Sequence, residues 1–322
     1  MAGNEQKDRK GRIRQVVAWV GTFALLTYLA ATTDLDQVWR ALGMANLPLF
    51  AAAVVGITFL TWFSDVATAR MLLQRAGFPV GFGDYSRAKG ASYLLNIVNY
   101  NLGLVLLAAV VSRRSERGLG ASGSPFILMN FLDLAAMGLL VVGGLLAGAS
   151  PFPPEPTLLL AIIGTGAVLG GPVLCGLARI RSAPGWIGRL LAHDLLSAFR
   201  ALRPADIALI VGVRLVFVSE YVLMQWLFLW SFGFDMQKLN LWVINPILGL
   251  IGFIPISVSG IGTTQVAMRS LFGPTAPAGV DPTSAVDACS TLGILSMLLV
   301  RILIGLACLP WVTRALAKRD ER

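Results

Sequence analysis

The sequence predicts an all-α polytopic membrane protein, on the grounds of composition, hydropathy and the placement of charge. Of its 322 residues, 56% are hydrophobic and only 13% are charged, and the mean hydropathy is +0.74. Soluble domains carry about 25% charged residues, so this chain lacks the polar surface of a cytosolic enzyme. The same composition excludes a disordered protein. A secreted disulfide scaffold is excluded as well, because the three cysteines fall within apolar stretches.

Apolar stretches of membrane-spanning length divide the chain into predicted helices. A helix crosses the hydrocarbon core in roughly 20 residues, and six stretches qualify as full spans: 15–32, 48–72, 124–148, 157–178, 205–231 and 285–312. Two further apolar regions, 85–111 and 240–272, are interrupted by polar and glycine residues. Irregular backbone survives at membrane depth only where protein or water covers it. We interpret both regions as re-entrant hairpins.

The net charge of +9 agrees with this layout. Most of the 26 Lys and Arg residues fall in segments that the layout places in the cytoplasm: 7–14, 70–89, 113–117, 179–203 and 314–322. Predicted outer segments contain only Arg40, Lys238 and Arg269. Cytoplasmic loops of membrane proteins carry such an excess of positive charge. We therefore expect cytoplasmic termini and no nucleic-acid partner.

The predicted spans form two halves, 1–150 and 151–322, which we interpret as a first membrane repeat and a second, inverted repeat. Each half contains a span, an amphipathic segment (35–46 or 185–203), a second span, a hairpin and a last span. An odd number of crossings in the first half makes the two hairpins enter from opposite faces. Many transporters have inverted repeats with broken helices, and their substrates bind near the midplane at the breaks.

The second break has the most distinctive local sequence. Helix-stopping and helix-starting residues follow one another closely there: Pro255, Ser257, Ser259, Gly260, Gly262, Thr263, Thr264 and Gln265. A helix that begins at such a break presents free backbone N–H groups, which suit a phosphate or a carboxylate. A glycine-rich turn that lets two helices pack closely would have the same sequence, and both interpretations stay open.

Ionisable residues within the spans are the next candidates, because they are costly in a membrane and usually paired or functional. Asp65, Asp133, Arg214 and Arg301 each lie roughly 10–16 Å from the predicted cytoplasmic ends, at about 1.5 Å per residue. Glu220 lies deeper. Buried Arg–Asp pairs would hold the bundle together. An arginine left incompletely paired would instead receive an anionic head group, and Arg301 is our first choice.

Other polar residues are weaker candidates. The first hairpin is interrupted by three asparagines, Asn96, Asn99 and Asn101. Two interpretations stay open: they line the other half of the substrate cavity, or their amides satisfy the backbone groups of the break. His193, the only histidine, fits an interfacial position. Several tryptophans lie near predicted span ends, as interfacial anchors do: Trp39, Trp62, Trp230, Trp242 and Trp311.

Motifs for catalysis or cofactor binding are missing from the sequence. It has no nucleophile–base pair, Walker loop, dinucleotide fingerprint or metal-ligand spacing. We therefore expect no enzyme activity, no cofactor and no metal.

The breaks and the last span resemble those of the lysylphosphatidylglycerol synthase/flippase family. The residues that carry the resemblance are the Pro-x-Ser and Gly-x-Gly pattern of 255–265, Arg301 followed by Gly305, and the segment 89–103. Gln265 stands where the family usually has an acid, and Tyr100 stands where a proline is common. Synthases of the family also carry a soluble aminoacyl-transferase domain, and we expect none in the short stretch after Val312.

The resemblance implies a flippase-like protein of the bacterial or archaeal plasma membrane. It would move a phospholipid or a polyprenyl-linked anionic lipid between leaflets, with the head group at the second break, Arg301 and Arg214. Two alternatives stay open: an enzyme that modifies a lipid head group, with Asp133 or Glu220 as its base, and a non-catalytic subunit. The expected partners are membrane lipids; homo-oligomers or another protein of the cell envelope are left open.

Overall fold

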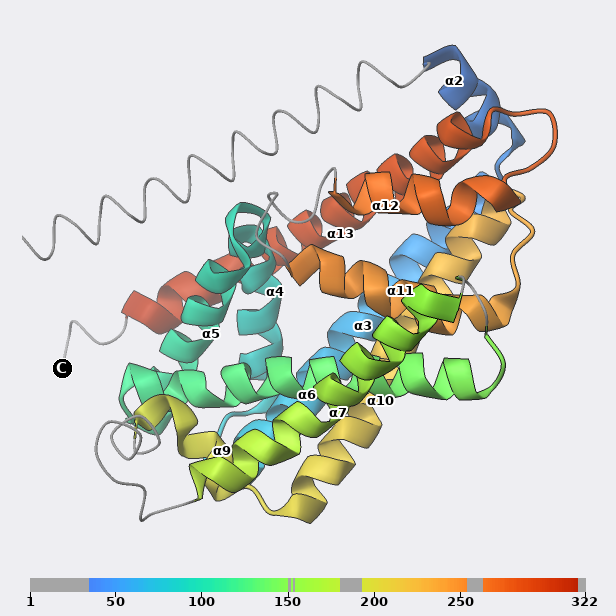
Figure 1. Ribbon diagram of the computed structural model, residues 1–322. Coiled ribbons are helices and arrows are strands. Elements are labelled where there is room, and N and C mark those ends of the chain that lie inside the picture. Colours follow the sequence, from blue (N-terminus) through green and yellow to red (C-terminus); the bar gives the residue numbers. More distant parts are fainter. Residues whose placement is uncertain (1–34, 150–151, 153, 180–192, 254–262, 318–322) are drawn as a thin grey trace, which may run out of the picture.

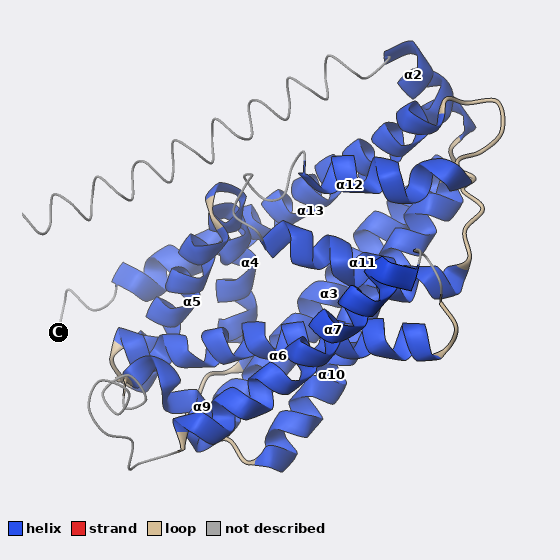
Figure 2. Cartoon of the chain, viewed as in Figure 1, coloured by secondary structure: helices blue, strands red, loops and turns tan. Residues whose placement is uncertain are grey.

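The protein is helical throughout the part that its computed structural model describes, which is residues 35–149, 152, 154–179, 193–253 and 263–317. These residues form helices and no strand (Figures 1 and 2). Among them, five helices are long and apolar enough to cross a membrane. The prediction of an all-α membrane protein is confirmed at this level. The predicted span 15–32 lies outside the described residues.

The five long helices fall on predicted spans. They are α3 (Leu47–Arg75), α6 (Leu119–Leu146), α7 (Pro154–Ala178), α10 (Pro204–Ser231) and α13 (Pro282–Ala317). Their ends differ from the predicted ones: α6 begins before residue 124, and α13 continues past residue 312. Hydropathy marks only the apolar part of a helix, and backbone hydrogen bonding continues beyond it. Trp62 consequently lies near the middle of α3, not at its end.

Shorter helices occupy the segments between the long ones: α2 (Leu35–Met44), α4 (Phe82–Val98), α5 (Tyr100–Ser115), η1 (Asp194–Leu196), α9 (Ser197–Ala201), α11 (Lys238–Phe253), α12 (Thr263–Phe272) and η3 (Gly273–Thr275). Helices α4 and α5 meet at Asn99 and pack against each other (Figure 1). The interruption predicted within 85–111 is therefore a sharp break. Helices α11 and α12 contact each other within the second predicted hairpin, and the break between them lies outside the described residues.

Glycines permit two close helix crossings. A Cβ atom on Gly138 of α6 would lie 2.4 Å from the carbonyl oxygen of Gly164 on α7. A Cβ atom on Gly305 of α13 would lie 2.6 Å from Cγ of Leu94 on α4, and one on Gly90 would lie 2.5 Å from Sγ of Cys308. Membrane helices associate through such small residues because lipid supplies no hydrophobic driving force. The second crossing fixes α4 against α13.

Two hydrophobic clusters fill opposite ends of the bundle. In α3, the stretch Val66–Leu73 belongs to one cluster and Phe50–Ile57 to the other. In α10, Ile207 and Ile210 belong to the first cluster, and Val222–Leu229 contributes to the second. Most buried polar residues of the two helices lie between the parts that belong to the two clusters: Thr58, Thr61 and Asp65 of α3, and Arg214 and Glu220 of α10. The fold therefore positions a polar layer at mid-depth in the bundle.

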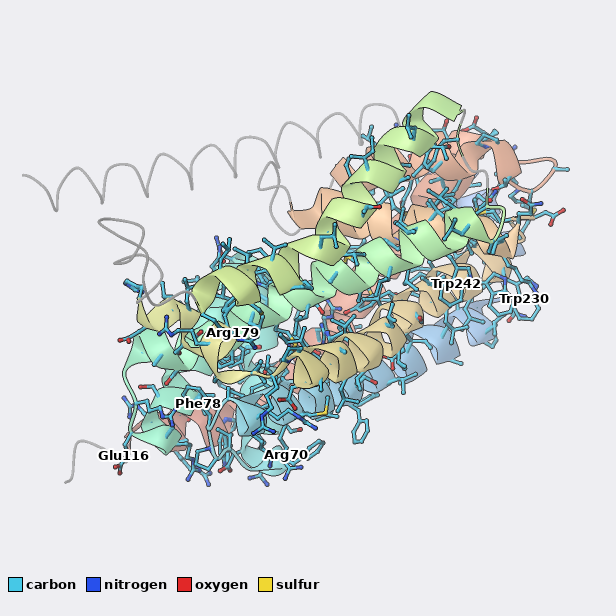
Figure 3. The ribbon with its side chains drawn as sticks, turned by 60° about the horizontal axis from the view of Figure 1, so that its bottom comes forward. Arg70, Phe78, Glu116, Arg179, Trp230 and Trp242 are labelled. Atoms are coloured by element: carbon cyan, nitrogen blue, oxygen red, sulfur yellow. The ribbon has the colours of Figure 1, made fainter. Side chains whose placement is uncertain are left out.

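The two ends of the bundle also differ in surface chemistry. Figure 3 shows Arg70, Glu116 and Arg179 toward one end and Trp230 and Trp242 toward the other. Tryptophan is typical of the boundary between hydrocarbon and water.

Candidate functional site

A polar stripe on α3 begins the mid-depth layer. Thr58, Thr61, Asp65 and Thr68 are all buried and recur at intervals of three or four residues, which places them on one face of the helix. The Thr61 hydroxyl donates to the carbonyl oxygen of Thr58 at 3.0 Å, and the Thr68 hydroxyl donates to that of Ser64 at 2.7 Å. The hydroxyls of Thr61 and Thr68 are thus satisfied within α3, whereas that of Thr58 is buried without a hydrogen-bond partner. Asp65 is the charged residue of this stripe, and its carboxylate contacts cations on other helices.

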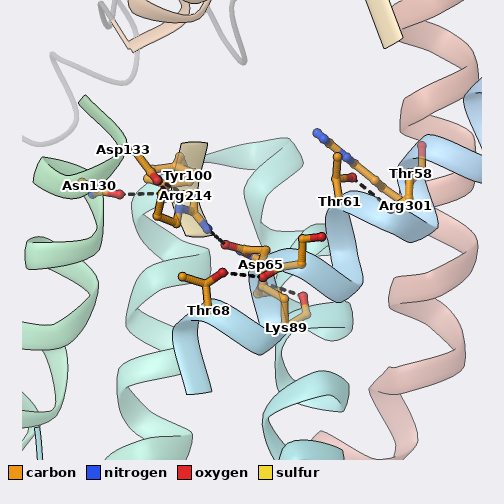
Figure 4. A network of polar contacts seen from close by, with 12 residues as sticks. Thr58, Thr61, Asp65, Thr68, Lys89, Tyr100, Asn130, Asp133, Arg214 and Arg301 are labelled. Atoms are coloured by element: carbon orange, nitrogen blue, oxygen red, sulfur yellow. Dashed lines mark hydrogen bonds and ion pairs between the residues drawn. The ribbon is translucent and has the colours of Figure 1, made fainter. Parts of the chain in front are cut away.

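Arg214 of α10 is held by two carboxylates (Figure 4). Its Nη1 donates to Oδ1 of Asp65 at 2.6 Å, and its Nη2 donates to Oδ2 of Asp133 at 2.7 Å. Its Nε also donates to Oδ1 of Asp133, which makes that pair bidentate. The arginine is 2% exposed, and its guanidinium carbon lies 3.7 Å from the ring centre of Phe217. The arginine is thus paired on every nitrogen.

Lys89 of α4 joins the same network. Its Nζ lies 2.5 Å from Oδ2 of Asp65, so Asp65 bridges two cations. The charge count placed Lys89 in a cytoplasmic segment, and that placement is wrong. Helix α4 begins at Phe82, so Lys89 lies about two turns, or ~10 Å, along the helix into the bundle. Two acids and two bases therefore balance in this cluster.

Arg301 of α13 has different surroundings. Its Nη2 donates to the hydroxyl oxygen of Tyr221 at 3.4 Å, and its guanidinium carbon lies 5.5 Å from the ring centre of Tyr93. Its Nε is buried and has no hydrogen-bond partner. Across the described ranges, no carboxylate lies within ion-pair distance of Arg301. A guanidinium without a carboxylate partner in the described residues therefore lies beside a charge-balanced cluster.

Tyr93 connects the two groups of charges. The Nζ of Lys89 lies 5.9 Å from the Tyr93 ring centre, and Arg301 contacts the same ring. Lys89 and Tyr93 are four residues apart on one face of α4. Arg301 and Gly305 are likewise four residues apart on α13, and Gly305 is one of the glycines at which α4 and α13 pack closely. The glycine crossing therefore brings Tyr93 to Arg301.

Glu220 lies apart from both arginines. Its Oε1 accepts a hydrogen bond from the Ser64 hydroxyl at 2.5 Å, whereas its Oε2 is buried without a partner. No described cation forms an ion pair with it. Of the five ionisable residues named from the sequence, Asp65, Asp133 and Arg214 meet in one cluster, and Glu220 and Arg301 have surroundings of their own.

The asparagines of the first break bond within their own hairpin. Oδ1 of Asn99 accepts from the backbone N–H of Asn101 at 2.8 Å and caps α5. Oδ1 of Asn96 fills the space above Gly103, where a Cβ atom would lie 1.7 Å away. Nearby, the Tyr100 hydroxyl donates to Oδ1 of Asn130 at 2.9 Å. These contacts stabilise a tight turn, and Asn99 and Asn101 remain exposed.

Only part of the second break is described. Pro255, Ser257, Ser259, Gly260 and Gly262 lie outside the described residues. Thr263 and Thr264 open α12, followed by Gln265. Gln265 is 5% exposed, and its Nε2 donates to the Thr291 hydroxyl of α13 at 3.0 Å.

His193 is exposed, and it caps η1 by accepting a hydrogen bond from the N–H of Leu195; its interfacial position stays a prediction. Searching the described side chains for three or more His, Cys, Asp or Glu groups that could hold a metal finds none.

Sequence reasoning missed Lys89, Tyr93 and Tyr221 as members of the site. Lys89 was counted with loop charges because its segment begins outside the membrane. The spacing of Lys89 and Tyr93 on one helix face was the available signal for α4. For Tyr221, adjacency to Glu220 in an apolar span was the only hint.

Fold and site together define an integral membrane protein with a charge-balanced cluster and a separate arginine inside its helix bundle. The chain belongs to the family described as the lysylphosphatidylglycerol synthase TM region, whose profile matches residues 15–311. That range includes every residue of the polar layer. A search among curated proteins finds no match.

Proposed function

We propose that the protein is a lipid translocase, or a lipid-binding transporter, that receives an anionic head group at Arg301. The observation that carries this proposal is the guanidinium of Arg301, which lies within the bundle without a carboxylate partner in the described residues. The family to which the chain belongs is named for a lipid-synthesising protein, which supports a lipid as the substrate. A phospholipid or a polyprenyl-linked lipid phosphate would supply the anion.

The chemistry of the two arginines distinguishes their roles. A guanidinium binds phosphate bidentately through two parallel N–H groups. Arg214 has already committed its nitrogens to Asp65 and Asp133. Arg301 has an orphaned Nε and one 3.4 Å bond to Tyr221. In this proposal Arg214 holds the bundle together, while Arg301 exchanges its weak contacts for a phosphate.

Lys89 gives the bound phosphate a second positive charge nearby. Both Lys89 and Arg301 contact the ring of Tyr93, so an anion bound to Arg301 would also lie near the charge of Lys89. Lys89 remains neutralised by Asp65 while the site is empty. The second break, 255–265, would approach the phosphate with its backbone N–H groups, as the sequence predicts.

The proposed route of transport follows from the proposed topology of six spans and two re-entrant hairpins in inverted halves. The α4–α5 pair with its break at Asn99 supports the first hairpin. Hairpins entering from opposite faces would expose a midplane site to each leaflet in turn. We place the protein in a bacterial or archaeal plasma membrane with both termini in the cytoplasm.

The test is reconstitution into vesicles with fluorescent phospholipids whose outer-leaflet fraction is measured by dithionite quenching. The wild-type protein is expected to accelerate equilibration of anionic lipids, and Arg301→Ala to reduce the rate at least tenfold. Arg301→Lys keeps the charge without the planar fork and should fall between them. Arg75→Ala, which removes a half-exposed ion pair with Asp206, is the matched control. Equal lipid movement with and without the wild-type protein would refute the proposal.

The head-group-modifying enzyme is a second candidate because one contact favours it. Ser64 and Glu220 form a 2.5 Å hydroxyl–carboxylate pair at mid-depth, which is the geometry of a hydroxyl beside a general base. Mass spectrometry of lipids from cells with and without the protein distinguishes the two functions. An enzyme changes lipid species, whereas a translocase changes only their sidedness.

A further inference from the structure

A groove between α10 and α11 lies outside the polar layer described above. Its cavity volume is about 400 Å³, and it opens on the surface of the bundle. The walls come from Val216, Leu223 and Trp226 of α10 and from Leu241 and Trp242 of α11. Val216 and Leu223 on these walls are 59% and 40% exposed in the described structure, so in a membrane they would contact lipid. The groove is therefore open to the acyl chains of the surrounding bilayer.

Polar residues that border the groove direct their polar atoms elsewhere. The Ser219 hydroxyl donates to the carbonyl oxygen of Leu215 at 2.7 Å. Oε1 of Glu220 accepts a hydrogen bond from the Ser64 hydroxyl on α3, and its Oε2 is buried. The groove thus presents hydrocarbon and aromatic surface along its length. Apart from Lys238 at one end, these walls offer a ligand little polar surface.

One cation stands beside the groove. Lys238, the first residue of α11, also lines it, and its Nζ lies 4.7 Å from the ring centre of Trp226. The Trp226 ring stacks in turn on Trp230, with ring centres 5.4 Å apart and planes 3° from parallel. Within the described chain no carboxylate forms an ion pair with Lys238. The ammonium of Lys238 therefore lies against two stacked tryptophan rings, with no carboxylate partner in the described residues.

The depth of this ammonium matches that of a lipid phosphate. Trp230 and Trp242 lie together toward one end of the bundle (Figure 3), and tryptophan is enriched at the level of lipid head groups. The apolar walls extend from that level toward Glu220, six residues deeper than Trp226, or ~9 Å along the helix. This is the arrangement of a phospholipid: a phosphate at the interface and a chain running into the core.

We infer that the α10–α11 groove binds one membrane phospholipid, with its phosphate on Lys238 and an acyl chain along Leu223 and Trp242. The bound lipid belongs to the leaflet at the Trp230 end. This site is separate from Arg301, and its occupancy does not depend on translocation. It fills the surface that the packing of α10 against α11 leaves open.

Photo-crosslinking in vesicles tests the inference. The full-length protein is reconstituted with phosphatidylglycerol that carries a diazirine in one acyl chain, and labelled peptides are mapped by mass spectrometry. Labelling is expected to concentrate on 216–226 and 238–242. Leu223→Trp, which fills the groove, should reduce it at least fivefold. Leu303→Trp on the exposed surface of α13 is the matched control, and Val216→Trp repeats the test if the first variant fails to fold.

The phosphate contact is tested by a second probe, diacylglycerol with the same diazirine chain. Lys238→Ala should reduce labelling by phosphatidylglycerol at least threefold and leave labelling by diacylglycerol unchanged, while Lys238→Arg should retain both. Uniform labelling of all lipid-facing helices would overturn the inference. So would unchanged labelling in both Leu223→Trp and Val216→Trp. Equal labelling by the two probes, or chain-to-chain crosslinks through the groove in place of lipid, would overturn it too.

Discussion

Arg214 is buried and Arg301 is half-buried in the same polar layer, and of the two only Arg214 is neutralised by carboxylates in the described residues. Arg214 is bound by two carboxylates on two other helices, α3 and α6. Arg301 contacts two tyrosines, and no acid in the described part of the chain pairs with it. A buried charge that loses its partner is strongly destabilising. Two arginines of one bundle thus have different surroundings, and stability and transport measurements can test whether their roles differ as well.

The largest expected effect is on stability, from Arg214→Ala. Asp133 would then lose the ion pair that the structure gives it, and Asp65 would keep only Lys89. Breaking a buried pair costs about 3–5 kcal/mol, so we expect a large fall in the free energy of unfolding. Thermal unfolding in detergent, followed by circular dichroism, measures it. A variant as stable as the wild-type protein would show that the pairs do not hold the bundle together.

An intermediate effect is expected from Gly305→Leu at the α4–α13 crossing. Any Cβ there would lie 2.6 Å from Cγ of Leu94, so α4 must move away. Overpacking of this kind costs about 1–3 kcal/mol. Because the crossing brings Tyr93 to Arg301, lipid movement should fall as well. Gly56→Leu, where a Cβ would meet no atom within 4 Å, is the control; equal losses in both variants would contradict the proposed role of the crossing.

A smaller effect is expected from Arg75→Ala. Its ion pair with Asp206 is 2.8 Å long, but the side chains are 33% and 27% exposed. Pairs in contact with water contribute about 0–1 kcal/mol. The free energy of unfolding, measured as for Arg214→Ala, should therefore change little. A loss as large as that of Arg214→Ala would mean that burial does not explain the difference between the two pairs.

The smallest effect on stability is expected from Arg301→Ala. Its removal leaves no described acid without a partner and removes a buried, unbonded Nε. We expect the free energy of unfolding to stay within about 1 kcal/mol of the wild-type value. Lipid movement in the vesicle assay should nevertheless fall at least tenfold. Severe destabilisation with unchanged transport per folded molecule would assign Arg301 to the scaffold instead.

Much of the fold could be predicted because lipid imposes simple constraints. Apolar stretches long enough to cross the core had to be helices, since a helix satisfies its own backbone hydrogen bonds. The break at Asn99 could be located from its polar residues, and its tight closure by Asn96 over Gly103 could not. The expected role of 255–262 stays a prediction, because those residues lie outside the described ones.

The sequence by itself determined that the chain is a helical membrane protein with charged residues inside its spans, because composition and span length depend only on the residues present. It also predicted similar depths for Asp65, Asp133, Arg214 and Arg301. Tertiary structure alone decided which of them meet, because partners on different helices depend on crossings such as that of Gly90 and Gly305. The packing of α10 against α3 and α6 neutralises Arg214, and the crossing of α4 and α13 leaves Arg301 beside Tyr93.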